Sequence, residues 1–424
     1  MKTSAAPERP IEREGPGETP RDAVGKRAWP VVEFGTVCDV QLGKMLSPKS
    51  KVGTRPVPYL RNENVQWARF DLTDVSWMDF TEAEERKFRL EPGDLLACEG
   101  GEPGRAAIWQ GQIARCCYQK ALHRIRPRAG LVHPPFVLYR LWLSSLAGEF
   151  TGSQTQTTIA HLPREKLIRL SIPLPPLAEQ ERIAAKLTEQ LAAVDRAREA
   201  AQSRLAAAEA LPAALLREVF EGPEASGWEA VRLGSLLRRY NEIIHPGDRK
   251  SGEAVFVGLE HIESHTGRRI GCDKVEFASL TGRKPTFKRG QIVYGYLRPY
   301  LNKVWIADFD GCSSVDQFAF DVNPELADTT FVAAFMRSAT FLRRAQGVTT
   351  TGQLPRISID EIAAVDIELP PNLATQNRIA AELTKKLTAA EGLIARCREE
   401  LAAIEALPAA LLRQAFGGTD QQGD

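Results

Sequence analysis

The chain contains one long segment twice, at residues 174–222 and 369–418. The first copy opens LPPLAEQERIAAKL and closes EALPAALLREVFEG; the second opens LPPNLATQNRIAAEL and closes EALPAALLRQAFGG. The second opening has one inserted residue. Beyond it the register holds, because Arg182 and Arg378 are 196 residues apart, and so are Glu209 and Glu405. The duplication predicts a chain built from two similar halves.

Each copy has the composition of one long helix, rich in Ala, Leu, Glu, Gln and Arg, with proline just ahead of its first turn. Apolar residues recur at alternating steps of three and four, a spacing typical of a coiled-coil seam. In the second copy this seam is Leu387, Ala390, Ile394, Cys397, Leu401 and Ile404. In the first it is Leu191, Val194, Arg198, Ala201, Leu205 and Ala208, where Arg198 interrupts it.

A helix with an apolar stripe needs a partner, and the chain supplies a second helix of matched length. We therefore expect the two helices to pack on each other. Two alternatives are that each helix lies on its own domain, or that the seam joins two copies of the chain. Pro212 and Pro408 occupy matching positions, where a proline breaks or bends a helix.

Each helical segment is preceded by a block of similar size, and the two blocks begin at Trp29 and Trp228. Each combines short strand-like runs, punctuated by Gly and Pro, with one helical run, and closes on a Thr-rich loop ending in Leu-Pro. This order predicts an α+β fold with pseudo-twofold tandem duplication. An antiparallel helix pair would then hold one block at each end. A helix over 179–210 is about 48 Å long, more than one DNA turn of about 34 Å.

Composition and motif content exclude several classes of protein and of binding site. The net charge of +1 argues neither for nor against nucleic acid, and no apolar run is long enough to span a bilayer. Residues 1–27 have no hydrophobic core segment, so they indicate a flexible leader and a cytoplasmic protein. The seven cysteines form no C-x-x-C pair, which indicates reduced thiols buried in cores. There is no P-loop. The sequence therefore predicts no cofactor and no metal.

Two clusters resemble catalytic sites. Asp94 and Glu99 resemble the acidic part of a Mg²⁺-dependent nuclease site, but Gly101 stands where such a site has lysine, and a hairpin loop explains the segment better. His261 and His265 are four residues apart and could face one metal, yet Glu263 and Gly267 favour a loop. A stand-alone nuclease that uses Asp94 and Glu99 remains an alternative, as does a coiled-coil scaffold with no DNA role.

The duplicated LPPLAEQERIAAKL-type helices, each following a variable block that begins at Trp, resemble the specificity subunits of type I restriction-modification systems. The resemblance covers 29–418. It implies a non-catalytic subunit in which two target recognition domains bind a bipartite double-stranded DNA target. It also implies two conserved helices that form an antiparallel coiled coil and dock two methyltransferase subunits, with restriction subunits completing the complex. Asn377 stands where the first copy has Glu181, and Asn372 is extra, which puts one partner contact in doubt.

The expected segments follow from this pattern. They are a leader (1–27), recognition domain 1 (28–166), helical region 1 (167–222), recognition domain 2 (223–361), helical region 2 (362–418) and a tail (419–424).

Candidate base contacts are Arg, Lys, Asn, Gln and Tyr side chains beside strands. In the first block they are Arg61, Asn62, Asn64, Arg105, Gln119 and Lys120. In the second block they are Arg283, Arg298, Tyr300, Asn302, Lys303 and Gln317. Phosphate contacts are expected from Thr157, Thr158, Thr349 and Thr350. Partner docking is expected from exposed helix positions, namely Glu179, Gln180, Arg182, Gln376, Asn377 and Arg378.

Overall fold

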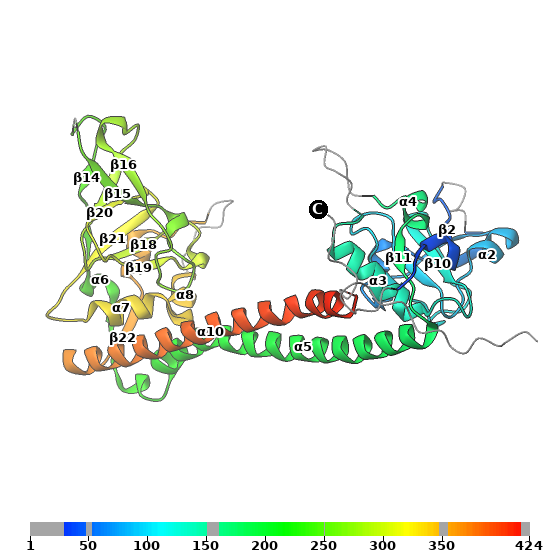
Figure 1. Cartoon of the computed structure of the whole chain (residues 1–424). Helices are drawn as coiled ribbons and strands as arrows, with labels where there is room; N and C mark the ends of the chain where they lie inside the picture. The colour runs from blue at the N-terminus through cyan, green and yellow to red at the C-terminus, as the bar shows by residue number, and fades with distance from the viewer. Residues whose placement is uncertain (1–28, 48–52, 151–160, 250, 347–354, 417–424) are drawn as a thin grey trace, which may run out of the picture. The chain divides into compact units, whose positions relative to one another are not determined.

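The computed structural model describes residues 29–47, 53–150, 161–249, 251–346 and 355–416 (Figure 1). The chain divides into a first unit, Met1–Glu199 with Ala402–Asp424, and a second unit, Ala200–Leu401. Each long helix contributes one part to each unit, so the first unit is built from two stretches of sequence and the second from one. Among the described residues, no helix combines the length and the apolar character needed to cross a bilayer.

The first unit is built on a four-stranded sheet of order β2-β10-β7-β8, covered by helix α3, and a three-stranded sheet of order β6-β3-β9. Its strands are β1 (Val31–Glu33), β2 (Cys38–Leu42), β3 (Pro56–Leu60), β4 (Val65–Gln66), β5 (Arg69–Phe70), β6 (Ser76–Asp79), β7 (Leu95–Cys98), β8 (Ala106–Ile108), β9 (Cys117–Tyr118), β10 (Leu122–Pro127) and β11 (Ser171–Pro173). Its helices are α1 (Phe34–Val37), η2 (Asn62–Asn64), α2 (Glu82–Phe88), α3 (Pro134–Leu146) and α4 (Arg164–Ile168).

The second unit has a four-stranded sheet of order β13-β21-β18-β19 and a five-stranded sheet of order β14-β17-β20-β15-β16. Its strands are β12 (Glu229–Arg232), β13 (Leu237–Tyr240), β14 (Ile243–Ile244), β15 (Glu253–Val257), β16 (Asp273–Glu276), β17 (Lys284–Phe287), β18 (Ile292–Gly295), β19 (Val304–Ile306), β20 (Gly311–Ser313), β21 (Gln317–Val322) and β22 (Asp366–Leu369). Its helices are η3 (Ala225–Gly227), α6 (Leu233–Leu236), η4 (Leu259–His261), η5 (Phe277–Ser279), η6 (Pro299–Leu301), α7 (Thr329–Met336), α8 (Ala339–Gln346) and α9 (Ile359–Ala363).

The two units repeat one topology. The sheet order β2-β10-β7-β8 matches β13-β21-β18-β19, and the pair β1-β11 matches β12-β22. The central strands β7 (LLAC) and β18 (IVYG) are buried over their whole length, which explains their continuous apolar sequences. The prediction of an α+β fold with tandem duplication is therefore confirmed. One detail differs, because the single helix expected after β21 is split into α7 and α8.

The two copies of the repeat form the helices α5 (Leu177–Glu221) and α10 (Leu373–Phe416). Each helix is continuous through its proline, Pro212 or Pro408, so the expected break is absent. A proline removes one backbone hydrogen bond of the helix. Apolar packing beyond the proline continues in each case, since Phe220 and Phe416 are both buried in cores.

Within the second unit, α5 and α10 pair antiparallel. The interhelical ion pairs join Arg204 to Glu400, Glu209 to Arg398, and Glu218 to Lys386. Residue numbers rise along α5 as they fall along α10, which fixes the direction. The first unit shows the same relation in its core, where Leu412 and Phe416 cluster with Leu187 and Leu191.

The predicted seam positions face inward, because all of them are buried or half-buried, Arg198 included. The helices therefore pair within one chain, as predicted, and not by the two alternatives.

Candidate nucleic-acid interface

The candidate residues of the first unit gather where two parallel strands end. Strands β3 and β9 pair in parallel, with Tyr59 opposite Cys117 and Leu60 opposite Tyr118. Arg61 and Asn62 follow β3, and Gln119 and Lys120 follow β9. Because the carboxyl ends of parallel neighbours lie at the same edge, these four residues share one edge of the sheet.

The turn between β7 and β8 joins this edge. Asn62 Nδ2 donates to the Gly100 carbonyl at 3.1 Å, and Arg105 Nη2 donates to the Asn62 carbonyl at 3.1 Å. Arg61 pairs with Glu63 at 2.6 Å and with Asp74 at 2.8 Å. Lys120 is exposed and has no ion pair among the described residues. The edge thus presents one unpaired cation beside two arginines whose carboxylate partners are solvent-exposed.

Asn64 has a structural position and does not face outward. It is 2 % exposed, and its Oδ1 accepts a hydrogen bond from the backbone N–H of Arg61 at 2.8 Å. Its Nδ2 donates to the carbonyls of Asp71 and Asp74. All of its polar atoms are therefore used to hold the loop that carries Arg61 and Asn62.

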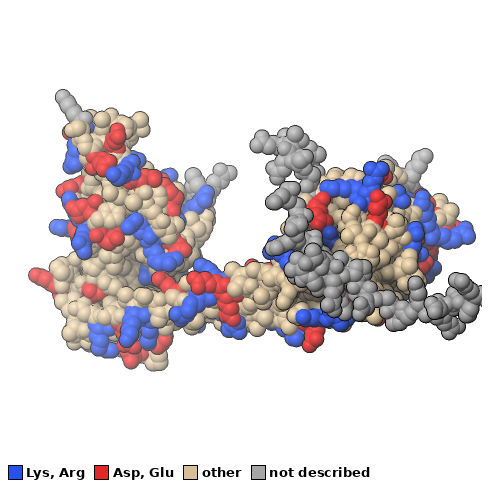
Figure 2. Space-filling model, in the orientation of Figure 1, with Lys and Arg blue, Asp and Glu red and all other residues tan. Residues whose placement is uncertain are grey.

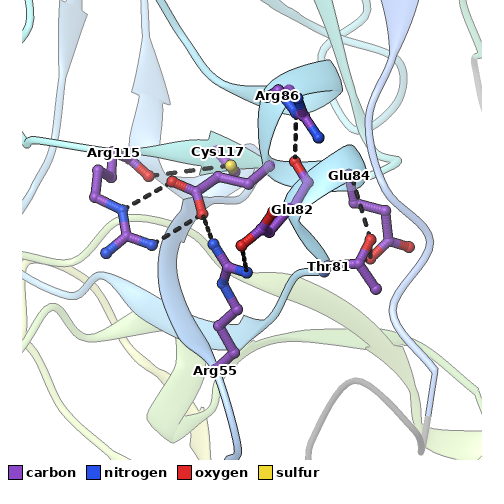
Figure 3. A network of polar contacts seen from close by, with 8 residues as sticks. Arg55, Thr81, Glu82, Glu84, Arg86, Arg115 and Cys117 are labelled. Carbon is purple, nitrogen blue, oxygen red and sulfur yellow. Dashed lines mark hydrogen bonds and ion pairs between the residues drawn. The ribbon is translucent and has the colours of Figure 1, made fainter.

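A charged cluster fixes the opposite end of the same strands (Figure 3). Arg115 precedes β9 and Arg55 precedes β3, and each donates to the carboxylate of Glu85 on α2. The two bonds from Arg115 are 2.8 Å long, and that from Arg55 is 3.2 Å. These bonds, those from Arg115 first, lower the pKa of the Glu85 carboxyl. Helix α2 is itself capped, because Glu84 N–H donates to Thr81 Oγ1. The strands whose carboxyl ends carry the candidates are thus tied to helix α2 at their amino ends.

The second unit repeats this arrangement with other side chains. Strands β15 and β20 pair in parallel, with Phe256 opposite Cys312. Helix η4 follows β15 as η2 follows β3. His261 Nδ1 accepts the backbone N–H of Gly258 at 3.0 Å, as Asn64 does for Arg61. Lys303 Nζ donates to the carbonyls of Leu259 and Ile262 at 2.6 Å, in the place of Arg105.

The remaining candidates of the second unit fall into exposed and buried sets. Arg283, Arg298 and Tyr300 are exposed, and Tyr300 is 48 % exposed on η6. Asn302 is fully buried in a left-handed conformation (φ 44°). Gln317 is 3 % exposed, and its Oε1 accepts the backbone N–H of Ser314 at 2.9 Å. Lys303 is half-buried, and burial lowers the pKa of its ammonium group.

Both candidate glutamines follow a cysteine within five residues, a spacing that suggests matching places, but they are not equivalent. The register of β3 with β9 and of β15 with β20 aligns Cys117 with Cys312, and hence Gln119 with Ser314. Gln317 instead begins strand β21, which corresponds to β10.

Sequence reasoning missed Lys44, which lies against the candidate edge. The Lys120 N–H donates to the Lys44 carbonyl at 2.8 Å, and Lys44 Nζ bonds Glu84 at 2.7 Å. The neighbouring Gly43 allows this approach, since a Cβ there would stand 2.2 Å from the Gln119 carbonyl oxygen. The only signal in the sequence was a glycine directly before a lysine at the end of an apolar strand.

The cysteine thiols and the Thr-rich loops are the subject of two further expectations from the sequence. Six cysteines are buried, but Cys272 is exposed, so the expectation of buried thiols was wrong there. Burial raises the pKa of the Cys38 and Cys117 thiols to about 12, which keeps them unreactive. Thr157, Thr158, Thr349 and Thr350 lie outside the described residues.

The geometry speaks against the nuclease alternative. Asp94 is 1 % exposed, and Arg126 holds it through two bonds of 2.6 and 2.7 Å. Asp94 and Glu99 flank strand β7, so they stand about 16 Å apart at about 3.3 Å per residue. Carboxylates this far apart cannot share one Mg²⁺, whose ligands lie at about 2.1 Å. The hairpin interpretation fits, since Gly93 has φ 95° ahead of the strand.

The histidine pair is no better as a metal site. His261, Glu260 and Asp273 do bring ligand atoms within 4.8 Å of one another, whereas His265 is not in this group. His261 Nδ1 accepts a backbone N–H, so in the neutral ring the proton is on Nε2, which faces Asp273 at 3.7 Å. A metal at Nε2 would require the proton to move to Nδ1, against the Gly258 N–H.

The helix starts contain one clear error of prediction. Gln180 and Gln376, expected to be exposed, are 1 % and 2 % exposed. Gln180 Oε1 accepts the N–H of His133, and Gln376 Oε1 accepts that of Asp328, each at 2.9 Å. Those two residues are the N-caps of α3 and α7. The glutamines therefore tie each long helix to the helix that covers the sheet.

The other helix-start candidates do reach the surface, apart from a half-buried Glu179. Arg182 and Arg378 are each 65 % exposed, and Asn377 is exposed. Glu179 pairs with Arg182 at 2.7 Å. On the face shown in Figure 2, Lys and Arg are interspersed with Asp and Glu, so charge alone does not mark an interface on that face.

Residues 26–200 match the model of the type I restriction modification DNA specificity domain. The EcoDI specificity subunit of Escherichia coli is 28% identical over 193 residues, which span 46% of this chain and 42% of that protein. The protein named as the type I restriction enzyme MjaX specificity subunit, from Methanocaldococcus jannaschii, is 23% identical over 420 residues, 92% of this chain and 91% of that one.

Solved structures agree on the fold. A chain from a study of complex assembly and conformational transition of the type I R-M system has a TM-score of 0.72 at 19% identity, and the match covers 95% of this chain and 99% of that chain. The HsdS subunit of Thermoanaerobacter tengcongensis has a TM-score of 0.57 at 18% identity, covering 92% and 96%. The fold is therefore shared over nearly the whole chain.

Proposed function

This chain belongs to the specificity subunits of type I restriction-modification systems, and from that premise we propose that it reads a bipartite double-stranded DNA target, one half-site by each unit. In the same proposal it docks two methyltransferase subunits and the restriction subunits, with no membrane partner. We further propose that it is a non-catalytic subunit, which its likeness to proteins named as specificity subunits supports.

The observation that carries this proposal is the doubled parallel-strand edge. The edges at β3–β9 and β15–β20 have the same backbone and different outward side chains. One presents Arg61, Gln119 and Lys120; the other has Gly258, Ser314 and Val315 in the matching places, with Tyr300 on the adjoining turn. Two recognition units with the same backbone arrangement and different side chains suit two different half-sites. The binding energies of the two half-sites add when the units are joined in one chain.

Each proposed role belongs to its own segment of the sequence. Residues 28–166 and 223–361 are the proposed recognition domains, and 167–222 and 362–418 the proposed helical regions, with 1–27 and 419–424 as leader and tail. In recognition, Arg61, Asn62, Arg105, Gln119 and Lys120 serve the first half-site, and Arg283, Arg298, Tyr300 and Lys303 the second. We assign Asn64 and Gln317, whose buried side chains bond the backbone, to holding the loops, and Asn302 is set aside as a DNA contact because it is buried.

Partner docking is proposed for Glu179, Arg182, Asn377 and Arg378 at the two helix starts. The buried Gln180 and Gln376 act there by fixing the helices to α3 and α7.

Methylation mapping of the host genome tests the proposal. Long-read sequencing with and without this chain should reveal one split adenine-methylated motif that disappears on deletion. Full persistence of every methylated motif in the deleted strain would contradict the proposal.

A further inference from the structure

A cavity of about 430 Å³ opens in the second unit between the hairpin that precedes Arg269, strand β19, helix α7 and helix α10. Its floor is apolar and includes Val304, Ala334 and Leu383. Thr330 and Thr384 add hydroxyl groups, and Arg337 stands at its wall. None of the candidate DNA or partner residues lines this cavity, so its role is unassigned.

The cavity exists because the second unit has small residues where the first unit has large ones. His133 and Asp328 are matching N-caps, so Tyr139 of α3 corresponds to Ala334 of α7, and Trp142 to Arg337. In the first unit, Tyr139 Oη lies 2.8 Å from Thr188 Oγ1. Thr384 is the matching threonine, and with Ala334 opposite it has no phenol to bond.

The hairpin above the cavity shows the same replacement. In the first unit its turn contributes Trp67, which stacks on Trp142 with ring centroids 5.0 Å apart and planes 5° apart. In the second unit the turn contributes Gly267 (φ 79°), and a Cβ there would stand 2.8 Å from the Arg337 guanidinium carbon. Three aromatic rings are thus replaced by a glycine, an alanine and one cation.

Arg337 carries a charge that forms no ion pair with any carboxylate in the described part of the chain. Arg268 is paired with Glu263 at 2.6 Å, and Arg269 with Asp308 at 3.5 Å. Among the described residues, the guanidinium of Arg337 has no ion pair, and its Nε is buried without a hydrogen-bond partner. Burial lowers the pKa of this guanidinium, and the field of Glu391 offsets that shift only in part. A half-buried, unpaired cation is costly, and an incoming anion would remove that cost.

We propose that this cavity is a docking site for a partner polypeptide that inserts an aromatic side chain next to a carboxylate. The ring takes the space that Tyr139 and Trp67 fill in the first unit, its polar edge bonds Thr384, and the carboxylate pairs with Arg337. A polypeptide fits better than DNA because the floor is apolar and α10 forms one wall. The inference rests on the proposed function, which supplies methyltransferase subunits as partners.

The test uses the full chain with two variants and one control. Ala334→Tyr fills the cavity as the first unit does, and Arg337→Gln removes the cation while keeping polarity. Arg289→Gln, on an exposed turn of the same unit, is the matched loss of one charge. Affinity for purified methyltransferase subunit should fall about tenfold or more in both variants, since a charged hydrogen bond is worth about 1.5–3 kcal/mol, and stay unchanged in the control. Affinity for target DNA, which also reports folding, should stay within about twofold.

If the methyltransferase subunit does not bind the wild-type chain, that result counts against the proposed function alone. A second measurement then tests the cavity by itself. In ligand-observed NMR, N-acetyl-tyrosine should bind the wild-type chain about tenfold more tightly than N-acetyl-tyrosinamide. Ala334→Tyr should abolish binding, and Arg337→Gln should abolish the preference. Equal binding to all variants would overturn the inference. A loss of DNA affinity in Arg337→Gln with partner affinity intact would also overturn it, and would assign the cation to a phosphate.

Discussion

In the first unit Asp94 is held by Arg126, and in the second unit the matching positions are occupied by Gln291 and Asp321. The acid of the first unit is replaced by an amide, the cation is replaced by an acid, and a 2.7 Å hydrogen bond joins Gln291 Nε2 to Asp321. In each unit the first residue also accepts a backbone N–H, from Glu91 or from Lys288. The pattern of bonds is retained while the chemistry changes.

The helix junctions behave differently from this pair. Gln180 and Gln376 are the same residue, and they bond the same cap position in each unit. Where a side chain joins a sheet domain to a long helix, the duplicated halves have stayed alike. Where side chains hold a hairpin or face outward, they have diverged. The comparison therefore separates the frame common to both units from the surfaces that distinguish them.

The buried pair tests whether the two solutions are interchangeable. Arg126→Ala should lower the free energy of unfolding by about 3–5 kcal/mol, because it leaves the Asp94 carboxylate buried without its cation. The double change Asp94→Gln with Arg126→Asp transplants the pair of the second unit and should recover part of that loss. Urea denaturation followed by tryptophan fluorescence measures both. No recovery in the double variant would show that the two hairpins are not equivalent.

The shared glutamines should give matched effects. Gln180→Ala strands the His133 N–H and the Pro175 carbonyl, and should cost about 2–3 kcal/mol. Gln376→Ala should cost a similar amount through Asp328 and Leu326. Hydrogen exchange at the first turns of α3 and α7 locates each loss. Unequal protection losses, with only one helix affected by its own variant, would break the proposed equivalence.

The outward side chains should give separable effects on DNA. Arg61→Ala should weaken target binding by about 2 kcal/mol and relax one half-site only, whereas Tyr300→Ala should relax only the other. Competition binding with duplexes mutated in one half at a time distinguishes them. Lys120→Ala is the comparison for a sequence-independent phosphate contact, which should weaken all duplexes alike.

The smallest expected effect is on how the stability of the fold depends on pH. Hydrogen bonds from Arg115 hold the pKa of Glu85 below its ordinary value, so the folded state binds this proton less readily than the unfolded chain. The stabilisation is present above the unfolded pKa and is lost as pH falls through the folded pKa. Glu85→Gln should therefore cost about 1 kcal/mol at neutral pH and flatten the loss of stability below about pH 4.5. Thermal unfolding between pH 3 and 7 compares the two chains, and identical pH slopes would argue against this cluster.

The sequence repeat alone was enough to predict most of the fold. The three-and-four spacing at Leu387, Ala390 and Cys397 identified the inward face of α10, because burial of a helix stripe depends on local periodicity. The continuity at Pro212 could not be predicted in this way. It depends on how well the helix packs on both sides of the proline, and distant residues decide that.

Only part of the candidate nucleic-acid interface could be predicted from the sequence. That Arg61 and Gln119 share an edge depends on the parallel pairing of β3 with β9, which joins segments almost 60 residues apart. The burial of Gln180 was missed because its partners, His133 and Leu131, are also distant in sequence. Polar residues at a helix start are usually exposed, so pattern alone pointed the wrong way.

The account depends most on two independent half-sites, and exchange of one recognition block tests this directly. Residues 223–361 would be replaced by the matching block of a related specificity subunit, and the methylated motif mapped by long-read sequencing in the same host. The account predicts that one half of the split motif is kept and the other half changes. A motif in which both halves change, or one that is continuous, would contradict it.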